Sequence, residues 1–383
     1  MDLAAQAGLY VHVPFCQQKC AYCSFYSFAP QAEDMRRYID AVQVQMQQLA
    51  RDAAVRPLSF ASIFFGGGTP STLPVAVLAE LLAECHTLFS FAEDALEITI
   101  EVNPGTIDAK GLQQLRRAGF NRLSIGIQSF ADQELQQLGR IHTSGEAQVT
   151  IEAARVAGFD NLSFDLMYGL PGQSVRSWQE TLERALALAP EHLSLYELTV
   201  EEGTPFFLQA QQGQWALPSE DAVLAMMAAT ETAIGCSPLV RYEISNYAVA
   251  GRQCRHNLNY WHNGLYLGLG PGAVSAFGGQ RRATVADFPD FCQRVAAGQS
   301  VWAEVEQLDV AAAFRETVIM GLRLLAGVSI TELYQRFGLD VTTYYGATLH
   351  RLLDQRLVAI EGGRLFLTRQ GLPLANQVMA DLV

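Results

Sequence analysis

The chain has 383 residues, of which 39 are acidic and 26 are basic, for a formal net charge of −13. This acidic balance argues against a nucleic-acid partner, because affinity for phosphates comes largely from Lys and Arg. The N-terminal segment has no basic start, and no apolar run is free enough of glycine and charge for a membrane helix. We therefore expect a soluble cytoplasmic protein of two or three domains with no integral membrane segment.

Short β-branched or aromatic runs alternate with amphipathic stretches over the first two hundred residues. The runs predict strands at 8–13, 60–65, 96–102, 122–127, 161–168 and 192–198. Apolar residues at helical spacing predict helices at 34–49, 74–89, 145–157 and 175–189. Strands that recur with helices between them indicate βαβ units and a parallel sheet. We predict an α/β fold built as a partial (β/α)6 barrel.

Polar and glycine-rich segments follow the carboxyl ends of the predicted strands. They comprise a cysteine loop after the first strand, residues 66–71 after the second, Glu101 and Asn103, Gln128 and Ser129, Asp165, Glu197 and Thr199. In a parallel sheet these ends meet at one rim, where ligands bind. The sequence therefore predicts one site assembled from several segments.

Three of the seven cysteines, Cys16, Cys20 and Cys23, form the pattern C-x3-C-x2-C. Thiolates are soft ligands that suit zinc or iron–sulfur clusters. Structural zinc needs four ligands, and the other cysteines are isolated from one another. Three thiolates on a four-iron cluster would leave one iron open to a small molecule. The alternative is that the spacing i, i+4, i+7 marks the buried face of a helix, which Pro14 and the aromatic residues at 25–28 disfavour.

The chain resembles the radical S-adenosylmethionine (SAM) superfamily, and within it the HemN-like branch. The resemblance rests on LYVHVPFCQQKCAYC, FFGGGTPS, IEVNPGT, SIGIQSF, FDLMYGLPGQ and the C-terminal region, and so covers nearly the whole chain. It implies that Cys16, Cys20 and Cys23 bind a [4Fe–4S] cluster and that SAM chelates the open iron. Lys19 either moderates the cluster's charge or is an ordinary exposed lysine.

The same resemblance implies which residues contact SAM. They are Tyr10 and Tyr22 beside the cluster, Gly67, Gly68 and Thr69 at the methionine amino group, Glu101, Gln128, Arg140 and Asp165 at the ribose and polar ends, and Thr199. Glycine would let the chain approach the ligand closely, although a tight turn after a buried strand would use glycine as well. Each polar residue, taken singly, could equally be a solvated or capping residue.

Two features distinguish the chain within the branch. Phe25 stands where the oxygen-independent coproporphyrinogen III oxidases carry a further cysteine, in C-x3-C-x2-C-x-C. The pattern H-N-x-x-Y-W, formed by His256, Asn257, Tyr260 and Trp261, is similar to that of the HemW haem chaperones. This resemblance implies that the chain binds haem and transfers it to acceptor proteins, among which respiratory proteins are candidates.

The chemistry of the H-N-x-x-Y-W pattern leaves two interpretations open. Imidazole suits haem iron, and Tyr and Trp offer flat apolar contact to a macrocycle. The alternative is that His256 is a packed, hydrogen-bonded structural residue, with Cys254 and His262 as nearby competitors for a haem contact. Because the cysteine loop and this pattern are far apart in sequence, we expect the haem and cluster sites to be separable.

The remaining segments complete the predicted organisation. Residues 268–279 predict a tight loop beside the site, and the segment after residue 300 predicts helices followed by a strand, a Gly-Gly turn and a strand, as in a winged helix. We expect a barrel core at 1–235, an extension at 236–300 and a small winged-helix-like α+β domain at 301–383. A haem carrier is the favoured function, ahead of an oxygen-independent coproporphyrinogen III oxidase and a radical SAM enzyme that modifies tRNA. Whether the chain is an enzyme is left open.

Overall fold

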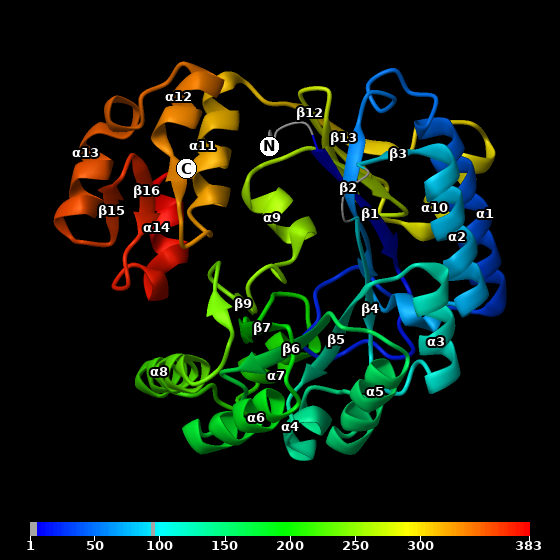
Figure 1. Ribbon diagram of the computed structural model, residues 1–383, viewed down its shortest axis with the longest axis horizontal. Coiled ribbons are helices and arrows are strands. Elements are labelled where there is room, and N and C mark those ends of the chain that lie inside the picture. Colours follow the sequence, from blue (N-terminus) through cyan, green and yellow to red (C-terminus); the bar gives the residue numbers. More distant parts are fainter. Residues whose placement is uncertain (1–5, 93–95) are drawn as a thin grey trace.

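The computed structural model describes residues 6–92 and 96–383. Within these residues the main sheet has the strand order β13-β12-β11-β10-β1-β2-β4-β5-β6-β7-β9-β8, and β3 pairs with β2. Its central strands run parallel: β1 (Gln6–Val13), β2 (Ser59–Gly67), β4 (Glu97–Val102), β5 (Arg122–Gln128), β6 (Leu162–Tyr168), β7 (His192–Glu197) and β10 (Tyr266–Leu269). The predicted α/β architecture with a parallel sheet is confirmed (Figure 1).

Shorter strands extend both ends of the parallel sheet. They are β3 (Ser90–Phe91), β8 (Val240–Arg241), β9 (Asn246–Ala248), β11 (Val274–Phe277), β12 (Gln280–Thr284) and β13 (Trp302–Gln307). β9 pairs antiparallel with β7 at one end, and β11 to β13 form an antiparallel meander at the other. Because the two ends do not pair with each other, the barrel stays open on one side.

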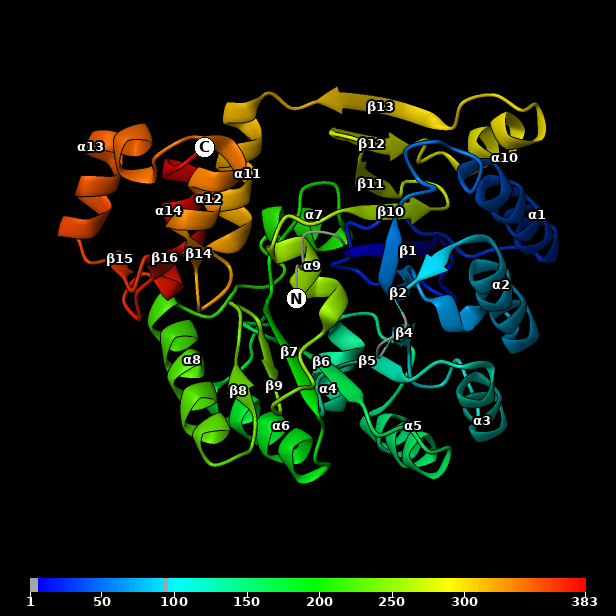
Figure 2. The ribbon, with the colours of Figure 1, turned by 45° about the horizontal axis from the view of Figure 1, so that its top comes forward.

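Except for α9, the helices that accompany the main sheet cover its outer face. They are α1 (Ala32–Leu49), α2 (Val75–Leu88), α3 (Ala109–Ala118), α4 (Asp132–Gln137), α5 (Ser144–Val156), α6 (Val175–Ala187), α7 (Pro205–Gln211), α8 (Glu220–Gly235), α9 (Arg255–Trp261) and α10 (Phe288–Ala296), with a 3-10 turn, η2 (Pro70–Thr72). The four predicted helices correspond to α1, α2, α5 and α6. In contrast to these, α9 lies on the inner side of the sheet, at the opening of the barrel (Figure 2).

The prediction of a tight loop at 268–279 holds for the turns at 270–272 and 278–279 but is wrong for the rest of the segment. The end of β10 and the whole of β11 occupy this segment, and β10 pairs with β1 in parallel from Gly8↔Tyr266 to Val11↔Leu269. The glycines serve close packing, since a Cβ on Gly268 would lie 2.3 Å from the Val274 carbonyl oxygen. The run thus supplies a further parallel strand, which its glycine content had concealed.

The inner face of the sheet carries polar side chains at every second position of several strands. They are Glu97, Thr99 and Glu101 on β4, Arg122 and Ser124 on β5, Ser163 and Asp165 on β6, and His192, Ser194 and Tyr196 on β7. Successive side chains of a strand alternate between faces, so these residues share the barrel interior. Parallel strands are usually apolar on both faces, and a polar interior therefore marks a place where ligands can bind.

The C-terminal segment forms a smaller unit with its own core. Its elements are α11 (Val310–Gly321), β14 (Val328–Ser329), α12 (Ile330–Phe337), α13 (Val341–Asp354), β15 (Val358–Glu361), β16 (Arg364–Leu367), η3 (Leu372–Leu374) and α14 (Ala375–Asp381). The predicted helices and the hairpin at Gly362 and Gly363 are present, and Phe314, Leu333 and Leu365 are buried in its core. The unit lies beside α8 and α9 (Figure 2). Among the described residues, none of the helices combines the length and the apolar character that crossing a bilayer requires.

Candidate cofactor-binding site

The cysteine loop leaves β1 and is held by backbone hydrogen bonds without forming a helix. The Cys16 amide donates to the Phe28 carbonyl at 3.0 Å, and the Phe28 amide donates to Pro14 at 2.9 Å. Ala21 bonds to Leu138 and Phe206 through its amide and carbonyl groups, at 3.2 and 3.0 Å. The alternative of a buried helical face is therefore wrong for these cysteines.

Polar groups from other strands reach the sulfur atoms of this loop. Cys16 Sγ lies 3.5 Å from Thr69 Oγ1, and Arg140 Nη1 donates to Cys20 Sγ at 3.5 Å. All three cysteines are half-buried, and burial, followed by the neighbouring Cys20 and Cys16 thiols, raises the pKa of Cys23. A cation and a hydroxyl donor beside thiols suit an anionic, sulfur-ligated group. Lys19 is exposed.

The sulfur atoms do not converge as they would around one ion. Within residues 6–92 and 96–383, no group of three or more His, Cys, Asp or Glu side chains is arranged to hold a single metal ion. A cubane cluster differs, because each thiolate binds a different iron atom. The half-buried thiols, the Arg140 guanidinium and the soft donor set fit such a cluster.

One hydrogen-bonded network joins the loops that follow β2, β4 and β5. Asn103 Nδ2 donates to Thr69 Oγ1 at 2.8 Å, and Arg140 Nη2 donates to Asn103 Oδ1 and to the Gly126 carbonyl, both at 2.6 Å. The network links Cys16, through Thr69, with Cys20, through Arg140. Thr69, Asn103 and Arg140 thus lie together at the rim, where Asn103 was expected as a polar residue that follows its strand.

The predicted glycines pack tightly against the first strand and the cysteine loop. A Cβ on Gly68 would lie 2.6 Å from the Phe15 carbonyl oxygen, and one on Gly67 would lie 2.6 Å from the His12 ring. Gly67 also has φ +115°, a conformation that other residues rarely adopt. Its amide donates to Glu101 Oε2 at 3.1 Å. The two glycines therefore form a tight turn after β2, and this turn lies against the cysteine loop at the rim.

A cavity of about 170 Å³ lies inside the barrel below this rim. The lining side chains are Tyr10, Phe64, Glu101, Arg122, Ser124, Asp165, Ser194, Tyr196, His256, Asn257 and Tyr260. Asp165 accepts from Ser124 Oγ at 2.9 Å, and burial raises the pKa of its carboxyl. Burial, reinforced by the charge of Asp165, raises the pKa of Glu101 to about 8. Three predicted SAM contacts, Tyr10, Glu101 and Asp165, therefore share this cavity with part of the H-N-x-x-Y-W pattern.

His256 is buried, with 1% of its surface exposed, and both of its ring nitrogens have partners. Nδ1 lies 2.8 Å from Ser62 Oγ and Nε2 lies 3.0 Å from Tyr260 Oη, while the ring stacks on Phe64 at 5.1 Å. Burial lowers the pKa of His256 to about 3. This geometry matches the packed, hydrogen-bonded alternative, and it brings the pattern beside Tyr10 despite the long separation in sequence.

The other predicted residues lie around the rim and the opening. Tyr22 packs in an apolar cluster with Phe206, Gln128 ends β5 with φ 66°, and Thr199 is exposed beyond β7 and does not line the cavity. Trp261 faces the C-terminal unit, where the Arg323 guanidinium lies 4.3 Å from the centre of its ring. A left-handed Gln128 is strained, which is common at ligand sites.

Several cavity residues escaped prediction from sequence. Arg122, Ser124, Ser194 and Tyr196 line the cavity, and Asn103 joins the rim network. The signal that could have found the first four is their spacing, because each lies two residues from another polar residue of its strand. Asn103 was expected at the rim because it follows its strand directly, but its role in linking Thr69 with Arg140 could not be predicted from sequence.

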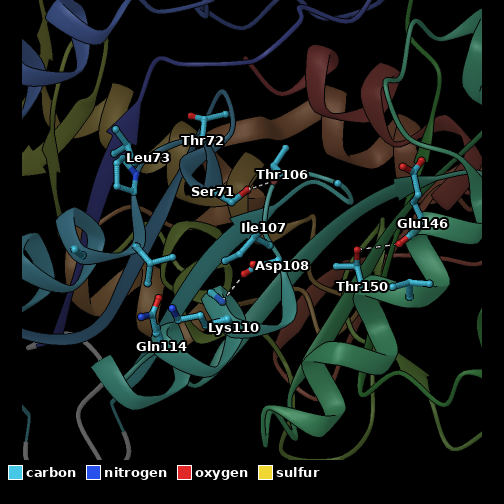
Figure 3. A pocket seen from close by; sticks show the side chains of 16 residues that line it. Ser71, Thr72, Leu73, Thr106, Ile107, Asp108, Lys110, Gln114, Glu146 and Thr150 are labelled. Carbon is cyan, nitrogen blue, oxygen red and sulfur yellow. Dashed lines mark hydrogen bonds between the residues drawn. The ribbon is translucent and has the colours of Figure 1, made fainter.

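A larger open groove, about 810 Å³, lies on the outer side of the same end of the barrel (Figure 3). It is lined by residues at the starts of α2 and α3 and by α5, where Asp108 accepts from the Gly111 amide at 2.7 Å and Ser71 Oγ lies 2.6 Å from Thr106 Oγ1. None of the predicted site residues lines it. The groove therefore belongs to the surface beside the rim.

Comparisons with known proteins agree with this architecture. The profile of the Radical SAM superfamily matches residues 10–185, and that of the HemN C-terminal domain matches residues 308–374. A Bacillus subtilis protein named heme chaperone HemW is 33% identical over 369 residues, which cover 96% of this chain and 97% of that protein. An Escherichia coli protein of the same name is 41% identical over 267 residues, 70% of this chain and 69% of its own length.

The fold also matches a solved structure over nearly its whole length. The structure described as coproporphyrinogen III oxidase (HemN) from Escherichia coli, a radical SAM enzyme, superposes with a TM-score of 0.86 at 24% identity, over 99% of this chain and 90% of that one. At this identity the similarity shows the fold. The chain therefore belongs to the radical SAM superfamily and, within its HemN-like branch, to the family of the proteins named heme chaperone HemW.

Proposed function

We propose that the protein is a haem chaperone, which binds haem and transfers it to acceptor proteins in the cytoplasm. The observation that carries this proposal is the relationship to a protein named heme chaperone HemW along 96% of the chain, with 33% identity. Phe25, in place of the further cysteine of the oxidases, and the H-N-x-x-Y-W pattern agree with it. Respiratory haem proteins are candidate acceptors.

The rim supports a [4Fe–4S] cluster and SAM as the accompanying cofactors. Cys16, Cys20 and Cys23 would hold the cluster, and such a cluster supplies electron transfer and an open iron for SAM. Arg140 would offset negative charge at Cys20, and Thr69 would donate a hydrogen bond to Cys16. Gly67 to Thr69, Glu101, Gln128 and Asp165 would contact SAM, and the position of Glu101 and Asp165 beside Tyr10 in the cavity supports this.

The position of His256 limits how it could contact haem. Its ring nitrogens already have Ser62 and Tyr260 as partners, and the adjoining cavity of about 170 Å³ is smaller than the 300–1,000 Å³ that pockets for drug-sized ligands usually enclose. Haem ligation by His256 would therefore require α9 to move out of the barrel. With α9 in place, haem would have to bind on the surface of the protein.

The deciding experiment combines a haem titration with a product assay. Anaerobically reconstituted full-length protein is titrated with haem and then mixed with an apo-haem protein, and a second sample receives coproporphyrinogen III and SAM. We expect saturable haem binding and transfer, with no protoporphyrinogen IX above the level of a Cys16→Ala control. Absence of saturable haem binding would refute the proposal, and product formation well above the control would favour the oxidase.

The cluster assignment has its own test. The triple change of Cys16, Cys20 and Cys23 to Ala should abolish the brown chromophore and the bound iron, which should amount to about four irons per chain in the wild type. Cys85→Ala is the matched control, because Cys85 is a buried cysteine of α2 away from the loop. A triple variant that keeps the chromophore would show that other residues bind the iron.

A further inference from the structure

Arg122 is a buried cation that makes no direct hydrogen bond or salt bridge within the described residues, although the Glu97 and Asp165 carboxylates lie near enough to favour its charge. Its side chain is at the start of β5, with 1% of the residue exposed, and it lines the cavity inside the barrel. Its Nε has no hydrogen-bond partner, and within residues 6–92 and 96–383 its guanidinium forms neither a hydrogen bond nor a salt bridge. Buried charges are normally paired, because removing an ion from water is costly. The arginine therefore points to a missing partner.

The acceptors around Arg122 are committed to other donors. The Glu97 carboxylate accepts the backbone amides of Arg255 and His256, at 3.1 and 3.2 Å, and so fixes the start of α9. Asp165 accepts from Ser124 and Ser163. The charge of Arg122 also reaches the two buried imidazoles, since it adds to burial in lowering the pKa of His192 and of His256. Burial disfavours the charge of Arg122, whereas Cys254 and the Glu97 and Asp165 carboxylates outweigh this effect and raise the pKa of Arg122. The guanidinium is therefore charged inside the barrel, and within the described residues none of these groups bonds to it directly.

The cavity beside Arg122 offers space and further donors. Its volume of about 170 Å³ exceeds what a single water molecule needs, and the side chains of Tyr196 and Asn257 also line it. A planar guanidinium recognises a carboxylate through two parallel hydrogen bonds. We propose that this cavity is a binding site for the carboxylate group of an organic ligand, anchored by Arg122.

The two acids in the cavity are compatible with a bound carboxylate. Asp165 is already bonded by serine hydroxyls, and Glu101 receives the Gly67 amide at 3.1 Å. Burial raises the pKa of Glu101 to about 8, so near neutral pH this carboxyl is mostly protonated and can donate a hydrogen bond. Arg122 therefore supplies the positive charge, while Glu101 adds little opposing charge.

The test uses propionate as the probe, with the full chain at constant ionic strength. We expect propionate to raise the melting temperature of the wild-type protein in a saturable way, and we expect propionamide, which has the same shape without the charge, to have no effect. Arg122→Met should abolish the response, whereas Arg51→Met, at an exposed arginine, should leave it unchanged. Should Arg122→Met fail to fold, Arg122→Lys keeps the charge and should raise the half-saturating concentration about tenfold or more, because the two-pronged contact is lost.

A second experiment determines which ligand supplies the carboxylate. It compares the binding of haem with that of haem dimethyl ester, in which both propionates are blocked. If a haem propionate occupies the site, Arg122→Met weakens haem binding but leaves binding of the ester unchanged. If the ligand is a free small carboxylate, the variant loses the propionate response and keeps full haem affinity. A wild-type protein that does not respond to propionate, or an Arg122 variant with wild-type affinity for it, overturns the proposal. If the protein binds propionate but no haem, the carboxylate site stands and only the proposed chaperone function is contradicted.

Discussion

Asn103 ties together the polar groups that approach the cysteine loop. Its amide nitrogen donates to Thr69, and its amide oxygen accepts from Arg140. Each of those partners contacts a cysteine sulfur. Because an amide has both a donor and an acceptor, Asn103 can satisfy two groups that could not bond to each other in this arrangement. Asn103 therefore couples the position of Thr69 to that of Arg140, each of which also has a backbone partner of its own.

Asn103→Ala should weaken the cysteine site from a distance. The change leaves one hydrogen-bonding group of Thr69 and one of Arg140 without its partner, so we expect the free energy of unfolding to fall by about 1–3 kcal/mol. Urea unfolding of the apo protein measures this loss, and iron content after reconstitution should fall as well. Asn263→Ala is the control, since Asn263 bonds to Glu316 and Thr317 in the C-terminal unit and should leave iron content unchanged.

His256→Ala should damage more than a haem contact. Removal of the imidazole leaves Ser62 and Tyr260 without their partner and opens space beneath Phe64, so unfolding free energy should fall by about 2–4 kcal/mol. Because the ring lies beside Tyr10, cluster and haem occupancy should fall together. Loss of haem with full iron content and unchanged stability would instead show that His256 is a direct haem contact.

The turn after β2 is the element that sets the position of the cysteine loop. Backbone bonds run from Gly68 to Val13 at 2.8 Å and from Thr69 to Phe15 at 2.7 Å, so the loop and the turn share one path. A side chain at Gly68 would collide with backbone, which cannot move aside as a flexible side chain can. The glycine therefore permits a contact between two pieces of main chain.

Gly68→Ala and Gly145→Ala should act in opposite directions. The Cβ at position 68 would lie 2.6 Å from the Phe15 carbonyl, so we expect a loss of about 1–3 kcal/mol in stability together with lower iron content. At Gly145, in the first turn of α5, the nearest atom is 3.9 Å away, so alanine should stabilise the helix by about 0.5–1 kcal/mol. Equal effects in thermal unfolding would contradict the packing argument.

Elements with a strong local pattern could be predicted from the sequence, whereas those defined by distant partners could not. β1, β2, β4, β5, β6 and β7 are recognisable because each is a β-branched or aromatic run. β10 is short and contains glycine, and only its pairing with β1 makes it a strand. The cysteines were identified by spacing, but Arg122 becomes part of a site only when α9 closes the barrel beneath it. The strand β10 and the role of Arg122 depend on contacts between residues far apart in sequence, which a local pattern does not contain.

At the scale of the whole molecule, buried ionisable groups set the response to pH. Burial lowers the pKa of His12 to about 4, of His142 to about 4 and of His256 to about 3, and raises that of Glu101 to about 8. Below the ordinary histidine pKa of 6.5 the unfolded chain takes up more protons, and above the ordinary glutamate pKa of 4.5 the folded chain holds one more. As pH rises, the buried histidines therefore increase the stability of the folded protein, whereas Glu101 decreases it.

The free energy of unfolding of the apo protein should be greatest near pH 6.5, which is the ordinary pKa of histidine. Toward pH 4 each buried histidine removes up to about 1.4 kcal/mol per pH unit. Between pH 6.5 and 8 stability falls because Glu101 is deprotonated in the unfolded chain but must be protonated in the folded one. Urea unfolding across this range measures the profile. Glu101→Gln should flatten the alkaline side and steepen the acid side between pH 4.5 and 6.5, where Glu101 opposes the histidines. A variant with the same alkaline loss would show that Glu101 is not its source.

A buried ion pair joins the barrel to the C-terminal unit. Arg323 lies 3.5 Å from the fully buried Glu243, and its guanidinium covers the ring of Trp261. Burial raises the pKa of Glu243, and Arg323 partly offsets this effect. The pair connects α9 and the segment around Glu243 with the end of α11. It is the most buried of the charged contacts between the two units, which also include Arg281 with Glu316 and the exposed pair of Arg369 with Glu231.

Arg323→Met should be costly because it leaves a buried carboxylate alone. We expect a loss of about 3–5 kcal/mol in unfolding free energy, and a smaller loss for Glu243→Gln or for both changes together. Arg369→Met, which removes an exposed pair with Glu231, is the control and should cost less than about 1 kcal/mol. Equal losses for Arg323→Met and Arg369→Met in calorimetry would contradict a role for Arg323 in joining the two units.

The pairing of β10 with β1 has a consequence for the protein while it is being made. About 250 residues separate the two strands, so a ribosome adding ~5–20 residues per second completes β10 roughly 13–50 s after β1. During that time one edge of β1 has no partner, and the cysteine loop that follows it lacks the support of Arg140 and Asn103 until those residues emerge. An unpaired apolar strand invites association with other chains. We therefore expect the cluster to be inserted after translation is complete. We also expect other chaperones to bind the nascent chain and to protect the unpaired edge of β1.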